Sequence, residues 1–168
     1  VGAAYALSEQ FDTPVLLKMC TRISHSQSIV ETAERKVQPK KPYEKNAPKY
    51  IMMPGYAKLR HPVVEKRMES LTAYAETTPL NRVEKGDGSI GIITSSACYQ
   101  YVKEVFGDRA DVLKLGLVNP LPKQLILNFA KSVKRLVVIE ELDGIIERHC
   151  KARGLDVEGK NLFPPVGE

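Results

Sequence analysis

Hydroxyl, guanidinium and imidazole groups are concentrated in one short stretch, Thr21-Arg22-Ile23-Ser24-His25-Ser26. An Arg beside hydroxyl groups supplies the donors that capture a carboxylate or a phosphate through paired hydrogen bonds. A His in the same stretch changes its charge near neutral pH. We therefore take Thr21, Arg22, Ser24 and His25 as candidate substrate-proximal residues. A polar joint between two domains explains the same residues equally well.

Gly86-Asp87-Gly88, followed at a distance by Asn119, imitates the Gly-Asp-Gly…Asn signature that binds magnesium and thiamine diphosphate. In that signature the Asp follows a buried strand, so that it reaches the metal from the carboxyl end of the strand. Here the triplet precedes its apolar strand. We interpret it as a turn, either of a hairpin or between a short edge strand and a buried one.

Three further groups have both a structural and a functional explanation. Ser95-Ser96 precede a predicted helix, where their side chains can cap the free N–H groups, although the same position also binds anions. Glu140-Glu141 and Asp143 follow a predicted strand, where carboxylates can serve as acid and base, and Asp143 can also cap the helix that comes next. For all of these we favour helix capping or interaction with the helix dipole, and we expect a structural role for His149.

The elements that must position these residues follow from apolar periodicity. Strands are predicted at 90–94, 111–118 and 135–139, with helices between and after them at about 96–106, 123–133 and 144–153. Short connections between alternating strands and helices are typical of a mainly parallel sheet that is covered on both faces. The fold class is therefore α/β and three-layered, and we place Ile92, Leu115 and Val137 on central strands.

The first 31 residues do not fit that domain. Ala4, Leu7, Ser8 and Phe11 recur at helical spacing, and Val15–Cys20 is an apolar run that predicts a strand. One helix and one strand cannot cover each other, so the strand would need neighbours that this chain does not provide. We expect 1–31 to be the end of another domain, 32–79 a Lys- and Pro-rich linker followed by a helix that starts at Pro62, and 80–168 the α/β domain.

Composition narrows the function classes. The chain has 168 residues, 43% hydrophobic and 27% charged, which is ordinary for a globular protein. Its three cysteines are far apart in sequence, which argues against a metal or iron–sulfur site here and suits a reducing cytoplasm. The net charge of +5 is densest where prolines interrupt the lysines, so we do not expect nucleic-acid binding. No apolar run approaches the length of a membrane span, so we expect no membrane partner either.

Four segments in order, AYALSEQFDTPVLLKMCTRISHS, HPVVEKRMESLTAYAETTPLNRVEKGDGSIGIITSSACYQYVKEVF, LGLVNPLPKQLILNFAKSVKRLVVIEELDGIIE and GKNLFPPVGE, resemble the large (alpha) subunit of indolepyruvate:ferredoxin oxidoreductases. These enzymes belong to the 2-oxoacid:ferredoxin oxidoreductases. The resemblance covers nearly the whole chain. Two positions depart from the family pattern, Ser96 where a Gly is expected and Asn119 where an aromatic residue is common.

The resemblance implies that 1–31 is the end of a pyrimidine-binding domain and that 80–168 is similar to the transketolase C-terminal domain. The implied parent decarboxylates an arylpyruvate such as indolepyruvate, with coenzyme A and ferredoxin as acceptors. It would use thiamine diphosphate, magnesium and 4Fe-4S clusters, and would act as an oligomer with a small beta subunit. We expect this segment to bind none of these cofactors and to be inactive alone. A pyruvate or 2-oxoglutarate oxidoreductase, or a non-enzymatic α/β binding module, remains an alternative.

Overall fold

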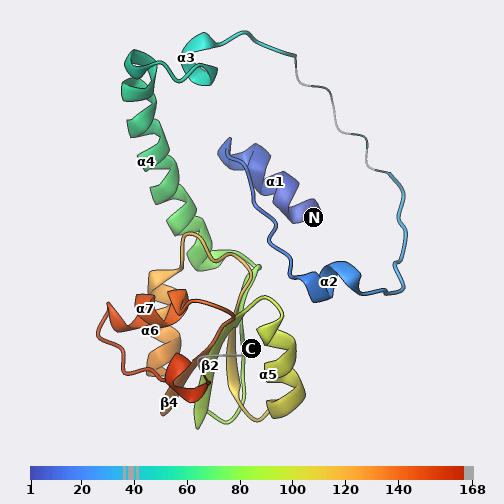
Figure 1. The fold of residues 1–168 in the computed structure, drawn as a ribbon, viewed down its shortest axis with the longest axis vertical. Coiled ribbons are helices and arrows are strands. Elements are labelled where there is room, and N and C mark those ends of the chain that lie inside the picture. The colour runs from blue at the N-terminus through green and yellow to red at the C-terminus, as the bar shows by residue number, and fades with distance from the viewer. Residues whose placement is uncertain (36, 38–39, 41, 165–168) are drawn as a thin grey trace. The chain divides into compact units, whose positions relative to one another are not determined.

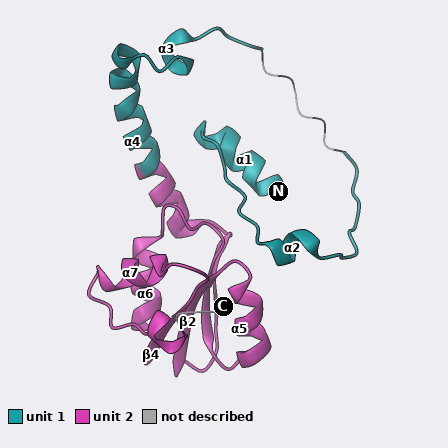
Figure 2. Ribbon diagram, in the orientation of Figure 1, with its two compact units in different colours: residues 1–68 teal, residues 69–168 magenta. Residues whose placement is uncertain are grey.

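The computed structural model describes residues 1–35, 37, 40 and 42–164. The chain forms two compact units, residues 1–68 and residues 69–168 (Figure 2). Lys36, Pro39 and Lys41 of the predicted basic linker, and 165–168 of the C-terminal run, lie outside the described residues. Among the described helices, none combines the length and the apolar character that crossing a membrane requires.

A four-stranded sheet organises the second unit (Figure 1). Its strands are β1 (Asn81–Glu84), β2 (Ile90–Ser95), β3 (Asp111–Leu115) and β4 (Arg135–Ile139), in the spatial order β1-β3-β2-β4. β2 is parallel to both β3 and β4, whereas β1 is antiparallel to β3. The mainly parallel sheet predicted from the sequence is confirmed.

Helices cover both faces of this sheet, which gives the predicted three layers (Figure 1). Helix α5 (Cys98–Phe106) packs on one face, where Val102 meets Ile92 and Val112. Helices α6 (Lys123–Lys131) and α7 (Ile145–Lys151) pack on the other face, in the larger of the two cores. That core contains Ile93, Leu113, Leu115, Ile126, Phe129, Leu136, Val138, Ile146, Cys150 and Val157.

Of the two interpretations of the Gly86-Asp87-Gly88 turn, the hairpin is wrong, because β1 and β2 both pair with β3 and not with each other. The other interpretation is confirmed, since the turn joins a short edge strand to a buried one. One further prediction about the sheet is wrong. Val137 lies on β4, which is at the edge of the four strands and not at the centre. The apolar character of β4 arises because helices cover it, and that character does not report its place in the order.

Helix α5 begins later than the serines predict. Ala97 occupies the N-cap position, no side chain caps the helix there, and Ser96 has a left-handed backbone with φ of 53°. The buried face holds Cys98 and Val102, while Tyr101 and Val105 are exposed. The prediction that Ser95 or Ser96 caps this helix is wrong, because the chain turns sharply at Ser96 before the first helical residue.

The first unit contains α1 (Gly2–Phe11), α2 (Thr21–His25), α3 (Ala47–Tyr50) and the first part of α4 (Pro54–Thr77). The predicted N-terminal helix is confirmed, with Leu7 as its buried residue. The predicted strand at Val15–Cys20 is wrong: these residues form no strand, and Leu16 is 90% exposed. A strand exists only through its pairing, and none of the described residues pairs with this run.

Helix α4 starts eight residues before the predicted position, so Pro62 lies inside the helix and not at its first turn. Proline lacks an N–H group and removes one backbone hydrogen bond, yet the helix continues through it. Leu71 and Ala75 are buried as predicted, whereas Val64 on the same predicted stripe is exposed.

Candidate functional site

The four candidate residues Thr21, Arg22, Ser24 and His25 share one short helix, α2, and all are exposed. The Ser24 hydroxyl donates to the carbonyl of Cys20 at 3.2 Å, which is a local bond at the start of the helix. The helix does not follow a strand, because Val15–Cys20 forms none. The structure therefore brings the four side chains together on one surface turn of the first unit.

The turn Gly86-Asp87-Gly88 is held by a residue from β3. The buried carboxylate of Asp111 accepts hydrogen bonds from the N–H groups of Gly86 at 2.8 Å and Gly88 at 3.0 Å. Lys85 Nζ lies 3.4 Å from the other oxygen of the same carboxylate. Burial by itself would raise the pKa of Asp111, but these N–H groups and Lys85 outweigh it and lower the pKa.

Thiamine diphosphate and its magnesium ion do not fit the residues of this turn. The carboxylate of Asp87 accepts bonds from the N–H and the hydroxyl of Ser89. Gly88 precedes β2, while Asn119 follows β3, which is parallel to β2. Asp87 and Asn119 therefore lie at opposite ends of the strands and cannot share one metal ion.

The described cysteines also do not fit an iron–sulfur cluster, because several Cys thiolates at one place must hold such a cluster. Cys98 lies on α5 and Cys150 on α7, on opposite faces of the sheet, and Cys20 belongs to the first unit. Burial raises the pKa of Cys150 to about 11, so this thiol stays protonated. Within the part of the chain that is described, no three His, Cys, Asp or Glu residues are grouped as metal ligands.

Carboxylates cap two of the helices at the carboxyl edge of the sheet. Glu140 accepts bonds from the N–H groups of Ile146 at 2.9 Å and Glu147 at 3.0 Å, at the start of α7. Glu76, near the end of α4, does the same for Gln124 at 2.8 Å and Leu125 at 2.7 Å in α6. The capping role proposed for Glu140 is confirmed, whereas Asp143 makes no such side-chain cap and α7 begins after Gly144.

Asn81 closes the same edge from β1. Its side-chain amide is buried, donates to the carbonyl of Ala75 at 2.9 Å, and accepts from the N–H groups of Gly116 at 3.0 Å and Leu117 at 2.9 Å. These hydrogen bonds join the start of β1 to the residues that directly follow β3. Nothing in the residue type marks this role, because an Asn before a strand normally predicts only a turn.

A polar network on the α5 face of the sheet was not predicted. The carboxylate of Glu84 accepts from Arg82 Nε at 2.9 Å and the Tyr99 hydroxyl at 2.8 Å, and forms an ion pair with Lys103 at 3.2 Å. Burial opposes ionisation of Glu84, yet these three partners outweigh it and lower its pKa to about 2. The carboxylate is held too firmly ionised to exchange protons near neutral pH.

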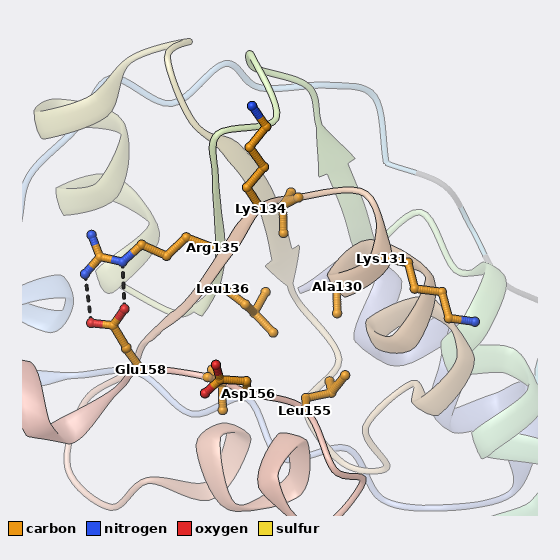
Figure 3. Close-up of a pocket in the computed structure, with 10 residues that line it drawn as sticks. Ala130, Lys131, Lys134, Arg135, Leu136, Leu155, Asp156 and Glu158 are labelled. Carbon is orange, nitrogen blue, oxygen red and sulfur yellow. Dashed lines mark hydrogen bonds and ion pairs between the residues drawn. The ribbon is translucent and has the colours of Figure 1, made fainter.

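The C-terminal segment closes the outer edge of β4. Glu158 exchanges backbone hydrogen bonds with Leu136 and Val138, and its carboxylate binds the Arg135 guanidinium through two bonds of 2.7 and 2.8 Å. Beside this pair is an open cavity of about 280 Å³ with Leu136 and Leu155 in its lining (Figure 3). Lys131 and Lys134 extend away from the cavity, and the charged groups of Arg135 and Glu158 in its lining are bound to each other (Figure 3).

His149, for which we expect a structural role, is partly buried on α7. Its Nε2 atom is buried and has no hydrogen-bond partner among the described residues, and burial together with the charge of Arg153 lowers its pKa. Burial thus favours the neutral imidazole, and no acid or base in the described part of the chain forms a hydrogen bond to Nε2.

The fold and these contacts define a class of protein: a three-layer α/β domain in which charged groups at the edge of the sheet bind the loops and helices of the domain itself.

No protein-family profile matches the chain. It is 34% identical over 169 residues to indolepyruvate oxidoreductase subunit IorA of Archaeoglobus fulgidus, a match that covers 96% of this chain and 27% of that protein. The corresponding subunits of Methanothermobacter marburgensis and Pyrococcus horikoshii are 35% and 30% identical and match 92% and 100% of this chain.

The resemblance to the indolepyruvate oxidoreductase large subunit is thereby confirmed, and the chain spans about a quarter of the length of these relatives. Among solved structures, a 2-oxoglutarate:ferredoxin oxidoreductase from Magnetococcus marinus, described with 2-oxoglutarate, coenzyme A and succinyl-CoA bound, is similar with a TM-score of 0.46 and 18% identity. That similarity covers 64% of this chain and 20% of the other.

Proposed function

We propose that this chain is an internal segment of a thiamine-diphosphate-dependent 2-oxoacid:ferredoxin oxidoreductase that acts on arylpyruvates such as indolepyruvate. The observation that carries the proposal is the similarity of nearly the whole chain to IorA subunits of indolepyruvate oxidoreductases. In this proposal coenzyme A takes the acyl group and ferredoxin takes the electrons. The parent polypeptide works in the cytoplasm with a small beta subunit.

Within that enzyme, residues 1–31 end a pyrimidine-binding domain, 32–79 form a linker with a helix, and 80–168 form a domain like the transketolase C-terminal domain. The role of 80–168 is structural. What supports this is the use of its carboxylates: those of Glu140 and Asp111 bind backbone N–H groups of the fold itself. The exposed apolar run that includes Leu16 supports burial of 1–31 against other parts of the parent.

The proposal is tested on the complete parent polypeptide, purified with its small subunit. We expect coenzyme A-dependent reduction of ferredoxin with indolepyruvate, at a kcat/KM at least about tenfold above that with pyruvate or 2-oxoglutarate. A preference for pyruvate or 2-oxoglutarate would assign the chain to another oxidoreductase of the same superfamily. The absence of any 2-oxoacid oxidation by the loaded complex would favour the non-enzymatic α/β binding module.

Arg22 and His25 provide the residue-level test of the same proposal. Both lie on the exposed helix α2, where a guanidinium can hold the carboxylate of a 2-oxoacid that reaches it in the assembled enzyme. We expect Arg22→Lys and His25→Asn to lower kcat/KM about tenfold or more in the complex, with Arg35→Lys as the matched control. Unchanged kinetics with a lower melting temperature would leave these residues as a structural joint.

A further inference from the structure

Positive charge is distributed unequally between the two units of the chain. Residues 1–68 contain 12 Lys and Arg against 6 Asp and Glu, whereas residues 69–168 contain 13 against 14. The whole net charge of +5 therefore originates in the first unit. A local excess of this size attracts anions, provided that some of the cations converge on one point.

Three cations of the first unit converge on Asp12. Lys49 Nζ lies 2.8 Å from one carboxylate oxygen of Asp12, and Arg67 Nη2 lies 3.3 Å from the other. The Lys49 bond is the strongest influence that lowers the pKa of Asp12, and the charges of Arg67 and Arg60 lower it further. Lys49 comes from α3, both Arg residues from α4, and Asp12 from the end of α1.

The exposures of these side chains differ in a way that favours exchange of the anion. The side chains of Lys49 and Arg67 are only 28% and 16% exposed, so their charges are screened less than those of free surface residues. The Asp12 side chain is 58% exposed, so a competing anion in solution can reach the position of its carboxylate. The cations are thus the less exposed part of the cluster, and the carboxylate is its most exposed part.

We propose that Lys49, Arg60 and Arg67 form a binding site for the phosphate group of a small molecule, and that Asp12 occupies this site until such a group displaces it. Both oxygens of the Asp12 carboxylate are already used by Lys49 and Arg67. No hydrogen bond in the described structure joins Arg60 to Asp12, and the charge of Arg60 still acts on it. A phosphate has an additional oxygen for that third donor, and its charge of nearly −2 matches the local excess.

This inference does not rest on the proposed function, and it is tested on the protein by titration calorimetry with inorganic pyrophosphate. We expect Asp12→Asn to tighten binding about tenfold because the internal competitor is removed. Arg60→Gln and Arg67→Gln should each weaken binding about tenfold, and added salt should weaken it further. Lys58→Gln is the matched control, because Lys58 lies about 200° around α4 from Arg60 and should change little.

Weaker or unchanged binding in the Asp12→Asn variant, with the helix content unchanged by circular dichroism, would overturn the proposal. So would an effect of Lys58→Gln as large as that of Arg67→Gln, because binding would then depend on total charge alone. A second titration with coenzyme A distinguishes the sources of the phosphate. Tighter binding than that of pyrophosphate indicates a nucleotide-type ligand, and equal binding indicates recognition of the phosphate group itself.

Discussion

Asp111 is a buried acid whose purpose is local: one carboxylate fixes the turn between β1 and β2. Replacing it with Asn leaves the N–H groups of Gly86 and Gly88 with a weaker, uncharged acceptor. We expect Asp111→Asn to lower the free energy of unfolding by roughly 1–3 kcal/mol, measured by urea denaturation at pH 7. Asp108→Asn is the control, since Asp108 is almost fully exposed.

The pKa of Asp111 also predicts how the effect depends on pH. Its folded pKa is lowered from the usual value of 3.8, so its contribution to stability is present above that value and is lost as the pH falls through the folded pKa. The difference in stability between the wild type and Asp111→Asn should therefore be constant above pH 3.8 and shrink as the pH falls below that value. Parallel stability curves down to pH 2 would mean that the carboxylate charge does not matter.

Glu84 offers a direct measurement of electrostatics on the α5 face of the sheet. Its pKa of about 2 results from Arg82, Tyr99 and Lys103, which together outweigh the effect of burial. We expect a carbon-detected NMR titration to place the Glu84 midpoint well below the ordinary Glu value of 4.5. In the Tyr99→Phe variant the midpoint should rise, because one of the hydrogen bonds to the ionised form is lost.

A titration midpoint near 4.5 for Glu84 in the wild type would contradict the network. Because the folded pKa is depressed, the stability that Glu84 contributes is present above its unfolded pKa and is lost only as the pH falls toward 2. Loss of stability between pH 6 and 5 would therefore have to come from another group.

At the scale of elements, α4 and α6 are joined by a carboxylate and not only by apolar packing. Glu76 at the end of α4 accepts from two N–H groups at the start of α6, where the helix dipole favours negative charge. We expect Glu76→Gln to cost about 1 kcal/mol of unfolding free energy, because one bond keeps its acceptor and the charge is lost. Glu104→Gln, on an exposed part of α5, serves as the control and should cost less than half as much.

The same measurement separates capping from general charge effects. The loss caused by Glu76→Gln should shrink only modestly in 0.5 M salt, because the bonds to Gln124 and Leu125 are direct. A loss that disappears completely in salt would contradict the capping role and leave only a long-range charge effect.

At the scale of the whole molecule, the two units differ in how well their backbones are protected. Ile93 lies fully buried on β2, between two parallel neighbours, whereas Leu16 is exposed in a run that pairs with no described strand. We expect amide exchange at Leu16 to be at least about a thousandfold faster than at Ile93, measured by NMR in deuterated buffer. Equal protection at the two positions would show that 15–20 is an integrated strand.

This comparison also bears on the domain map that we propose. In the complete parent polypeptide, exchange at Leu16 should slow by a large factor, because the run would then be buried against other parts of the parent. Exchange at Ile93 should stay the same, because its neighbours belong to this chain already. Unchanged fast exchange at Leu16 in the parent would contradict the assignment of 1–31 to a sheet-containing domain.

The amino-acid sequence alone determined the α/β class, the strands of the parallel core and the resemblance to the indolepyruvate oxidoreductase large subunit. Apolar runs such as those containing Ile92 and Val137 are buried on both sides wherever they stand in the sheet, so periodicity identifies them without tertiary information. Helix α1 was identified for the same reason, since its apolar spacing is a local property.

Only the tertiary structure decided the strand order, the pairing of β1 with β3 and the state of Val15–Cys20. These depend on partners far away in the sequence, and a local pattern contains no information about them. The roles of Asp111 and Glu76 were hidden for the same reason, because each acid binds N–H groups more than 20 residues away. The convergence of Lys49 and Arg67 on Asp12 likewise exists only in the folded chain, where three separate segments meet.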